Sequence, residues 1–195
     1  MVLMQTRDAL ADELERLIRG CPWFMRVLEA ARACDPPDWW VGAGALRDLV
    51  WDTLHGGFDP ARVKDVDLAF FDPRDLSEER EERLERELTR RLPGVRWDAK
   101  NQAAVHTWYE RVFGYPVPPV WSAAEGVATW PETATAVAVR LHRDGELEVT
   151  APYGLADLLA GVCRRNPVRV SAEWYHRRLE AKHVATRWPR VRIIR

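Results

Sequence analysis

Two short segments carry most of the structural information in this chain: Val41–Asp48 (VGAGALRD) and Asp65–Phe71 (DVDLAFF). The first has a glycine on each side of Ala43 and leads into an apolar stripe of helical period, which predicts a turn followed by a helix. The second begins with two aspartates separated by one residue and continues as an apolar run, which predicts a buried strand. Side chains two apart on a strand point to the same face, so Asp65 and Asp67 are expected to lie together.

This pair of acids indicates a cation site. Two carboxylates about 4 Å apart repel by about 4 kcal/mol at an effective dielectric constant near 20, unless a cation or a proton lies between them. The glycines upstream let backbone N–H groups approach a phosphate, and the positive end of the following helix favours that anion. Arg47, in the first turn of the helix, is placed to pair with phosphate oxygens. The two segments together therefore favour metal-assisted chemistry on a phosphate.

The rest of the chain supplies a third acid and completes an α+β pattern. Val95–Lys100 alternates as a half-buried strand and carries Asp98. The order of strand, glycine turn, helix, strand, helix and strand places three aspartates on two neighbouring strands at one edge of a small mixed sheet. Three carboxylates suit Mg²⁺, with Mn²⁺ as an alternative. The remaining predicted elements are two helices before residue 39, a helix over 77–91, a hairpin of strands 135–141 and 146–150, and helices over 154–163 and 171–188.

Composition sets the outer limits. The chain has 195 residues, of which 47% are hydrophobic and 30% charged, and no apolar stretch approaches the roughly 20 residues that span a bilayer. The start of the sequence lacks the pattern of a secretory signal, so we expect a cytoplasmic protein. Three scattered cysteines argue against a disulfide framework or a structural zinc site. A net charge of −1 provides no overall field for nucleic acid, and we expect neither membrane binding nor reading of DNA grooves.

The quoted motifs resemble those of a known superfamily. Val41–Phe71 looks like the core signature of the polymerase-beta-type nucleotidyltransferases, and its Gly-Ala-Leu-Arg-Asp followed by Lys-Asp-Val-Asp-Leu is similar to the head domain of CCA-adding enzymes. Most of the chain from about Trp39 onward also resembles a bacterial nucleotidyltransferase-like family, formerly a domain of unknown function. The segments that carry this second resemblance are Trp51-Asp52, His55-Gly56, Lys100-Asn101-Gln102-Ala103, residues 130–136, residues 151–155 and Asn166-Pro167.

The resemblance implies a domain organisation and a metal site. It implies a polymerase-beta-type nucleotidyltransferase core with N-terminal helices in residues 1–110, and a C-terminal hairpin-and-helix extension in 111–195 packed on that core. Asp65 and Asp67 match the paired metal ligands of the superfamily, and a two-metal site is expected. Asp98 matches the third carboxylate, as general base or second-metal ligand, by its order and strand phase.

The resemblance also implies nucleotide contacts. Gly42 and Gly44 match the superfamily's glycine pair, although Ala43 separates two glycines that are adjacent elsewhere. Lys100 and Asn101 are placed next to the third acid, where they would contact the nucleotide together with Arg47.

Two functional hypotheses follow. The first is a metal-dependent nucleotidyltransferase that transfers a nucleoside monophosphate from a nucleoside triphosphate to an acceptor hydroxyl on a small molecule, a protein or an RNA end. The second is a catalytically inactive nucleotide-sensing or interaction protein that retains the fold. Two further features stay open between a structural and a functional role. The first is the set of basic residues in 164–182, for which a solvated helix face is favoured over a phosphate-binding site. The second is the set of aromatic residues in 108–121, for which core packing is favoured over stacking on a base.

Overall fold

The computed structural model describes the backbone of residues 2–194 and the side chains of residues 9–194. Its helices are α1 (Val2–Arg19), α2 (Pro22–Cys34), α3 (Ala43–Leu54), the 3-10 turn η1 (Pro60–Arg62), α4 (Glu78–Arg91), α5 (Val105–Phe113), α6 (Ala123–Val127), α7 (Ala156–Leu159), α8 (Ala172–Ala181) and α9 (Val184–Arg187). Its strands are β1 (Trp40–Gly42), β2 (Val66–Phe70), β3 (Trp97–Asn101), β4 (Ala138–Leu141), β5 (Leu147–Thr150), β6 (Val162–Arg164) and β7 (Arg192–Ile194). In this described part, no helix is long and apolar enough to cross a membrane.

The predicted mixed sheet is confirmed. Five strands pair in the order β3-β2-β1-β4-β5, with β2 and β3 parallel and the other pairs antiparallel, and β6 pairs with β7 in a separate parallel ribbon. Strands β4 and β5 form the predicted hairpin and hydrogen-bond to β1 through β4. Residues on both sides of position 110 thus contribute to one sheet. The division into a core and an extension remains a prediction.

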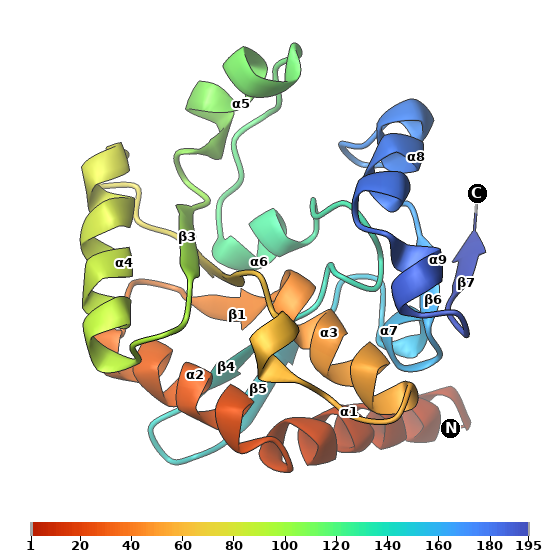
Figure 1. Cartoon of the computed structure of the whole chain (residues 1–195). Coiled ribbons are helices and arrows are strands. Elements are labelled where there is room, and N and C mark those ends of the chain that lie inside the picture. Colours follow the sequence, from red (N-terminus) through yellow and green to blue (C-terminus); the bar gives the residue numbers. More distant parts are fainter. Residues whose placement is uncertain (1, 195) are drawn as a thin grey trace.

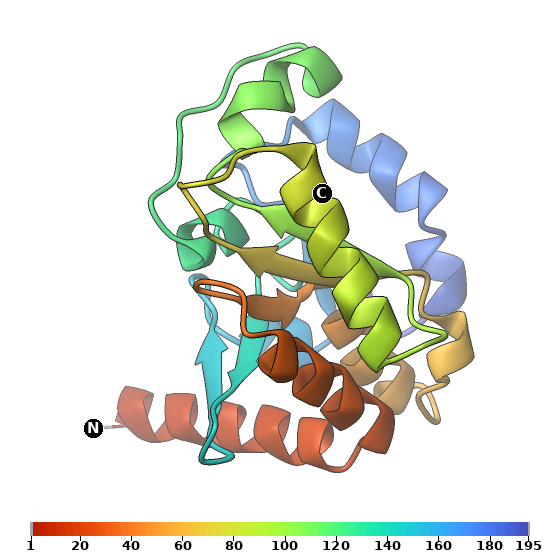
Figure 2. The same ribbon diagram turned by 90° about the vertical axis from the view of Figure 1, so that its left-hand side faces the viewer.

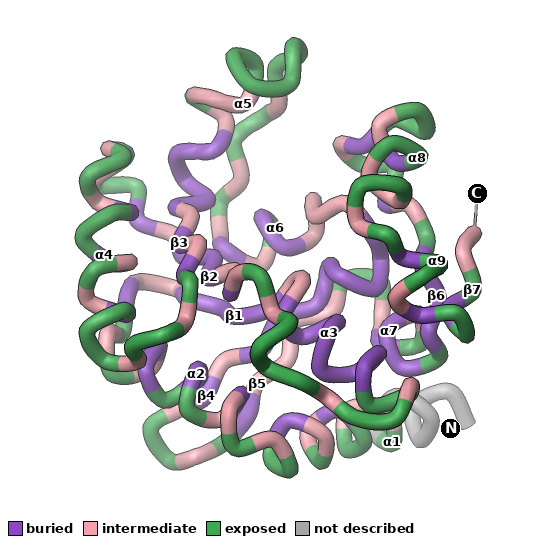
Figure 3. The backbone as a smooth tube through the Cα atoms, in the orientation of Figure 1, coloured by how far each residue is buried: buried purple, intermediate pink, exposed green. Residues whose placement is uncertain are grey.

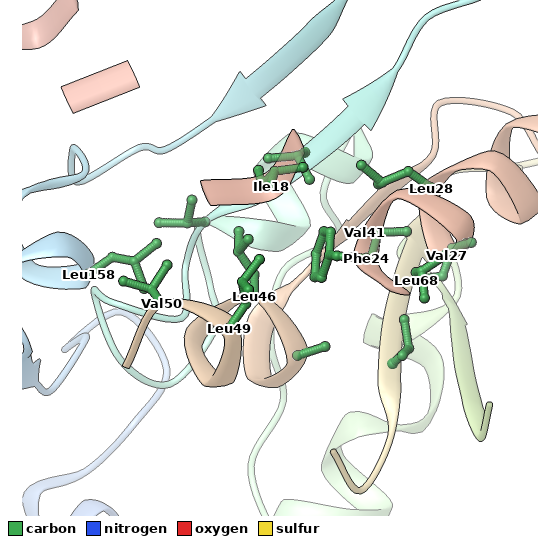
Figure 4. Close-up of a cluster of buried hydrophobic side chains, with 14 of the residues drawn as sticks. Ile18, Phe24, Val27, Leu28, Val41, Leu46, Leu49, Val50, Leu68 and Leu158 are labelled. Atoms are coloured by element: carbon green, nitrogen blue, oxygen red, sulfur yellow. The ribbon is translucent and has the colours of Figure 1, made fainter. Parts of the chain in front are cut away.

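One face of the sheet holds the main hydrophobic core. Strand alternation directs Val66, Leu68 and Phe70 of β2 into a buried cluster formed with helices α1, α2, α3 and α7. Figure 4 shows side chains from these helices, among them Phe24 and Leu46, pointing toward the strands. Figure 3 shows the same division along the backbone, with the strands mostly buried and the outer surfaces of α4, α5 and α8 exposed. The hydrophobic residues of β2 therefore fix which way its acidic residues point.

The other face of the sheet is only partly covered. Helix α6 packs there on Trp40, Ala69 and Ala138 in a small second cluster. Figures 1 and 2 show α5 and α8 standing beyond this face, with the strands between them and the helices of the main core. Two cavities lie beside β2 and β3 on this face, and both are lined by Asp67 and Asp98.

The exposed edge of the sheet is closed by helix α4. Ser77 caps this helix by accepting a hydrogen bond from the Arg80 N–H. Two of its glutamates face the sheet and not the solvent. Glu85 accepts from the Ala99 N–H at 2.9 Å and Glu81 accepts from the Asn101 N–H at 2.8 Å, so they satisfy donors of the edge strand β3 that would otherwise be unpaired.

The C-terminal region differs most from the sequence-based expectation. The helix predicted over 154–163 is the short α7, after which Gly161 turns the chain into β6. The helix predicted over 171–188 is divided into α8 and α9, because His183 adopts a left-handed conformation with φ of 51°. Pairing with β7, which is distant in sequence, determines the strand character of β6. Local periodicity could not show this pairing.

Gly42 is required by a close backbone approach. A Cβ at this position would overlap the carbonyl oxygen of Val137 and lie 2.7 Å from the Ala138 Cα, because β4 passes directly beside it. At Gly44, in contrast, the nearest atom to an added Cβ is the Asp67 Oδ2 at 3.7 Å, an ordinary contact. The turn therefore has room for a side chain at Gly44 but not at Gly42.

We predict that Gly42→Ala lowers the free energy of unfolding by at least about 2 kcal/mol, since rigid backbone must move to relieve the overlap. Urea denaturation followed by circular dichroism measures this value. Gly44→Ala is the matched control, and we expect its stability to equal or slightly exceed that of the native chain. Equal stability of the two variants would contradict the packing role of Gly42.

Candidate active site

The site begins with the parallel pairing of β2 and β3. The register places Asp67 directly beside Asp98, on the face of the sheet opposite the main core. Asp65, two residues before Asp67, immediately precedes the first residue of β2. All three carboxylates line one cavity of about 310 Å³. The structure thus brings together the three acids that the sequence singled out.

The acids are in an electrostatically unfavourable arrangement. The pKa of Asp67 is raised to about 7, first because its carboxyl group is buried, and then because Asp65 and Asp98 repel its negative charge. The Gly44 N–H, which donates to Asp67 Oδ2 at 3.3 Å, and the charge of Lys182 act in the opposite direction. A positive ion between these carboxylates would remove the repulsion.

Basic residues line the same cavity. They are Arg47 of α3, Lys64 of the loop before β2, and Arg178, Lys182 and Arg187 of the C-terminal region. Among the side chains that the structure describes, neither Lys64 nor Lys182 has a carboxylate oxygen within 4.0 Å. Burial is the main reason that the pKa of Lys182 is lowered, followed by repulsion from Arg178 and Arg47. The cavity thus combines acids with two lysines that have no carboxylate partner among the described side chains. This combination suits a ligand that carries both metal ions and phosphates.

Helix α8 presents a single stripe of residues to this region. Trp174, Arg178 and Lys182 are spaced four apart, which places them on one side of the helix. Arg178 is held there by the buried carboxylate of Glu132, at 2.5 Å from Nε to Oε1. Burial alone would raise the pKa of Glu132, but Arg178 and the Thr135 hydroxyl outweigh it and hold that pKa below its usual range. The sequence pattern had favoured a solvated face for these basic residues, whereas the structure places Arg178 and Lys182 in the wall of the cavity that the acids line.

Arg47 reaches the cavity wall in a fixed position. Its Nη2 lies 2.6 Å from Asp48 Oδ1, and its guanidinium lies over the Trp188 ring at 4.8 Å from the ring centroid. Arg187 pairs with the second oxygen of Asp48 at 2.9 Å and with Asp52 at 3.0 Å. This network joins α3 to α9. Arg47 is 7% exposed within this network, and the carboxylate of Asp48 partly neutralises its positive charge.

The predicted nucleotide-binding residues divide by strand phase. Lys100 shares a face with Asp98, but its Nζ is paired with Glu81 at 3.0 Å and with Asp98 at 3.3 Å. Asn101 has the phase of Trp97 and Ala99, so its side chain points away from the acids and is fully buried. Its amide bonds to the backbone at Asp72, Asp75 and Ala103. Asn101 thus holds the turn after β2 and is not part of the cavity wall.

The glycine turn also differs in detail from the expectation. Gly42 packs against β4, as described above, and the cavity is lined instead by Ala43 and Gly44. Ala43 has a left-handed φ of 51°, which an L-residue adopts at a cost of about 1 to 2 kcal/mol. The turn keeps this conformation because the Ala43 N–H donates to the Val137 carbonyl at 3.2 Å.

A second cavity, also of about 310 Å³, adjoins the first. Both are lined by Asp67, Asp98, Trp130 and Pro131, so they meet at the carboxylates. The additional walls of the second cavity are largely aromatic. The rings are Trp108, Tyr109, Phe113, Tyr115 and Trp174. Four of the five aromatic residues expected in 108–121 therefore line a cavity rather than fill the core, and Trp121 lies outside it with 76% of its surface exposed.

The donor set fits a divalent metal by its chemistry. Carboxylate oxygens are the ligands that Mg²⁺ prefers, and Mg²⁺ usually takes only one or two of them while keeping waters and substrate phosphates. Within residues 9–194, the side chains as they stand form no group of three or more acid, histidine or cysteine ligands close enough to hold an ion. The carboxylates suit an ion that arrives with a phosphate, rather than a closed protein cage.

Comparison with known proteins agrees with this geometry. A model of the Nucleotidyltransferase family matches residues 29–193. An NMR structure described as revealing a CCA-adding enzyme head domain is similar at 28% identity and a TM-score of 0.77, covering 94% of this chain and 95% of the other. No curated protein sequence matches the chain.

Two longer chains, both CCA-adding enzymes, share the fold at lower identity. The Thermotoga maritima enzyme complexed with tRNA has 17% identity and a TM-score of 0.55, with 93% of this chain and 42% of that chain covered. A CCA-adding enzyme in complex with ATP has 17% identity and a TM-score of 0.52, with 87% and 38% covered. This chain spans less than half the length of these enzymes.

The mixed sheet, the three acids on β2 and β3 and the glycine turn at the start of α3 define a nucleotidyltransferase fold of the CCA-adding head type. The chain belongs to the Nucleotidyltransferase family.

The buried position of Asn101 gives a test of its role. We predict that Asn101→Ala lowers the free energy of unfolding by about 3 kcal/mol, because four hydrogen bonds to buried backbone groups are lost. Chemical denaturation measures this loss, and calorimetric titration with ATP under native conditions measures binding. We expect the folded variant to keep the native ATP affinity. A variant of native stability with weakened ATP binding would instead assign Asn101 to the nucleotide site.

Proposed function

We propose that this protein is a metal-dependent nucleotidyltransferase that transfers a nucleoside monophosphate from a nucleoside triphosphate to an acceptor hydroxyl. The observation that carries the proposal is the single cavity in which Asp65, Asp67 and Asp98 face basic side chains. A nucleoside triphosphate with its metal ions has the complementary pattern of charge. Membership of the Nucleotidyltransferase family and likeness to a CCA-adding enzyme solved with ATP support the assignment.

The carboxylates would hold one or two Mg²⁺ ions, with Mn²⁺ as a substitute. When bound, such ions neutralise phosphate charge and lower the pKa of a coordinated hydroxyl. Asp65 and Asp67 are placed to bind ions together with the triphosphate. Asp98, on the neighbouring strand, is placed to take the proton of the acceptor hydroxyl.

The basic wall would receive the rest of the triphosphate. Arg178 of α8, Lys182 at the C-terminal cap of that helix, and Lys64 would supply positive charge for the β- and γ-phosphates, and the fixed Arg47 would add a fourth cation. In the reaction, the acceptor oxygen forms a bond to the α-phosphorus while the bond from that phosphorus to the bridging oxygen breaks. The electron pair of the broken bond leaves with pyrophosphate, and the hydroxyl proton passes to Asp98. Most of the rate enhancement would come from positioning and charge neutralisation.

Substitution of the central acid tests the chemistry. We predict that Asp67→Asn reduces transfer by at least about 100-fold, since it removes a charge from the place where metal and α-phosphate meet. The assay is transfer of label from α-³²P nucleoside triphosphates to a component of a cell extract, with Mg²⁺ and with chelator. This assay also identifies the acceptor.

Asp12→Asn, an exposed change on α1, is the matched control and should keep full transfer. Full activity of Asp67→Asn would contradict the mechanism. Binding of nucleotide by the native chain without any labelled product would favour the inactive nucleotide-sensing alternative. A cytoplasmic location remains a prediction from the sequence.

The basic wall is tested separately. We predict that Lys182→Ala weakens binding of tripolyphosphate and of ATP by about tenfold and reduces the dependence of binding on salt, because an uncommitted charge next to the phosphates is lost. Isothermal titration calorimetry at two ionic strengths measures both effects. Arg177→Ala, which removes an exposed cation from another side of α8, is the control and should bind as the native chain does. Unchanged affinity of Lys182→Ala would place the phosphates elsewhere.

A further inference from the structure

The second cavity, here called the aromatic cavity, is walled largely by the rings of Trp108, Tyr109, Phe113, Tyr115 and Trp174. It shares Asp67 and Asp98 with the cavity of the acids and cations, so a ligand held at these carboxylates can extend into both. One cavity is charged and the other is walled by rings. A single ligand that has a polyanionic tail and a flat ring system matches the walls of the joined pair.

Helix α8 links the two cavities directly. Trp174 lines the aromatic cavity, Arg178 and Lys182 line the charged one, and all three lie on one side of the helix. Trp174 and Lys182 are separated by about 12 Å along the helix axis, given a rise of about 1.5 Å per residue. A ligand lying along this stripe would contact a ring at one end and cations at the other.

The rings are arranged as an open platform. Phe113 of α5 meets Trp174 of α8 at 6.4 Å between ring centroids and 69°, and Tyr109 lies 4.4 Å from Phe113. Figures 1 and 2 show α5 and α8 standing on the same side of the sheet, where this contact joins them. Phe113 is 38% exposed and Tyr115 41% exposed, so a planar ligand could bury ring surface that now meets water.

Polar groups of the wall are largely engaged within the protein. The Gln102 amide donates to the Lys100 carbonyl at 3.2 Å, the Thr129 hydroxyl donates to the Gly126 carbonyl at 2.7 Å, and the Tyr115 hydroxyl donates to a backbone carbonyl. The guanidinium of Arg169 lies over the Tyr109 ring at 5.4 Å from its centroid and donates to the Pro118 carbonyl at 3.5 Å. Few groups are therefore left to read the edge of a base. Stacking without edge contacts tolerates all bases, because every base has a π-face.

We propose that the aromatic cavity holds the base of the donor nucleoside triphosphate by stacking on the rings of α5 and α8, with little preference among the four bases. The inference rests on the proposed function, because it assumes that the triphosphate lies in the adjoining cavity. It adds that the donor is selected as a flat ring joined to a polyphosphate, and that its base identity is not read closely.

Calorimetric titration of the full chain with Mg²⁺ and either ATP or inorganic tripolyphosphate tests the inference. Trp108→Ala should weaken ATP binding by about 5- to 100-fold and leave tripolyphosphate binding unchanged. Trp108→Phe keeps a ring and should retain most of the affinity. Trp121→Ala, an exposed ring outside the cavity, is the matched control and should bind ATP as the native chain does. ATP, GTP, CTP and UTP should bind to the native chain within about tenfold of one another.

Several outcomes would overturn the assignment. Unchanged ATP affinity in Trp108→Ala would do so, as would an equal loss for ATP and tripolyphosphate, which indicates damage to the fold of the wall. A third outcome is that adenosine binds while a non-hydrolysable ATP analogue is present at saturation, and that Trp108→Ala removes the binding of adenosine but not of the analogue. This result would assign the aromatic cavity to the acceptor. In these cases Asp67-dependent transfer can still be present, so only the base assignment fails. Absence of both ATP and tripolyphosphate binding to the native chain would contradict the proposed function itself.

Discussion

The parallel pairing of β2 with β3 is the constraint on which the site depends. Hydrophobic side chains of both strands, such as Leu68 and Ala99, are buried against the helices of the main core. Because strand side chains alternate, this burial directs Asp67 and Asp98 to the opposite face, and the register sets them side by side. The resulting repulsion is reflected in the pKa of Asp67, which burial and the two neighbouring acids raise to about 7. Core burial therefore maintains an arrangement of charges that would not be stable alone.

The C-terminal region supplies the opposite charge, and it does so through tertiary contacts. The buried Glu132 fixes Arg178, and the pairing of Arg187 with Asp48 and Asp52 fixes the end of the chain against α3. A buried ion pair adds little net stability, but the loss of one partner is costly, so such pairs restrict the geometry in which the helices can pack. The result is a rigid basic wall facing the carboxylates. Lys182 remains uncommitted on that wall and is available to a ligand.

The two cavities together describe a ligand with two unlike ends. The charged cavity suits phosphates and metal ions, and the aromatic cavity suits a planar ring, with the carboxylates at the junction. If a nucleoside triphosphate binds as proposed, the bond that breaks would lie next to the acids. The rings come from α5 and α8, which are far apart in sequence and meet through Phe113 and Trp174. In the proposed function, the two helices would hold the base of the nucleotide and the sheet would position the catalytic acids.

The sequence by itself determined the elements with strong local patterns. These include the turn and helix after β1, the Asp65-x-Asp67 strand, the capped helix α4, the β4–β5 hairpin and the shared face of Asp67 and Asp98, because side-chain periodicity and turn chemistry act over a few residues. Strand phase also held the information that Asn101 points into the core, although the position next to Asp98 had suggested otherwise. Only the tertiary structure decided the pairing of β6 with β7, the break between α8 and α9, and the placement of Trp174, Arg178 and Lys182 opposite the acids. These features depend on contacts between residues that are distant in the chain, and no local pattern encodes which distant surfaces will meet.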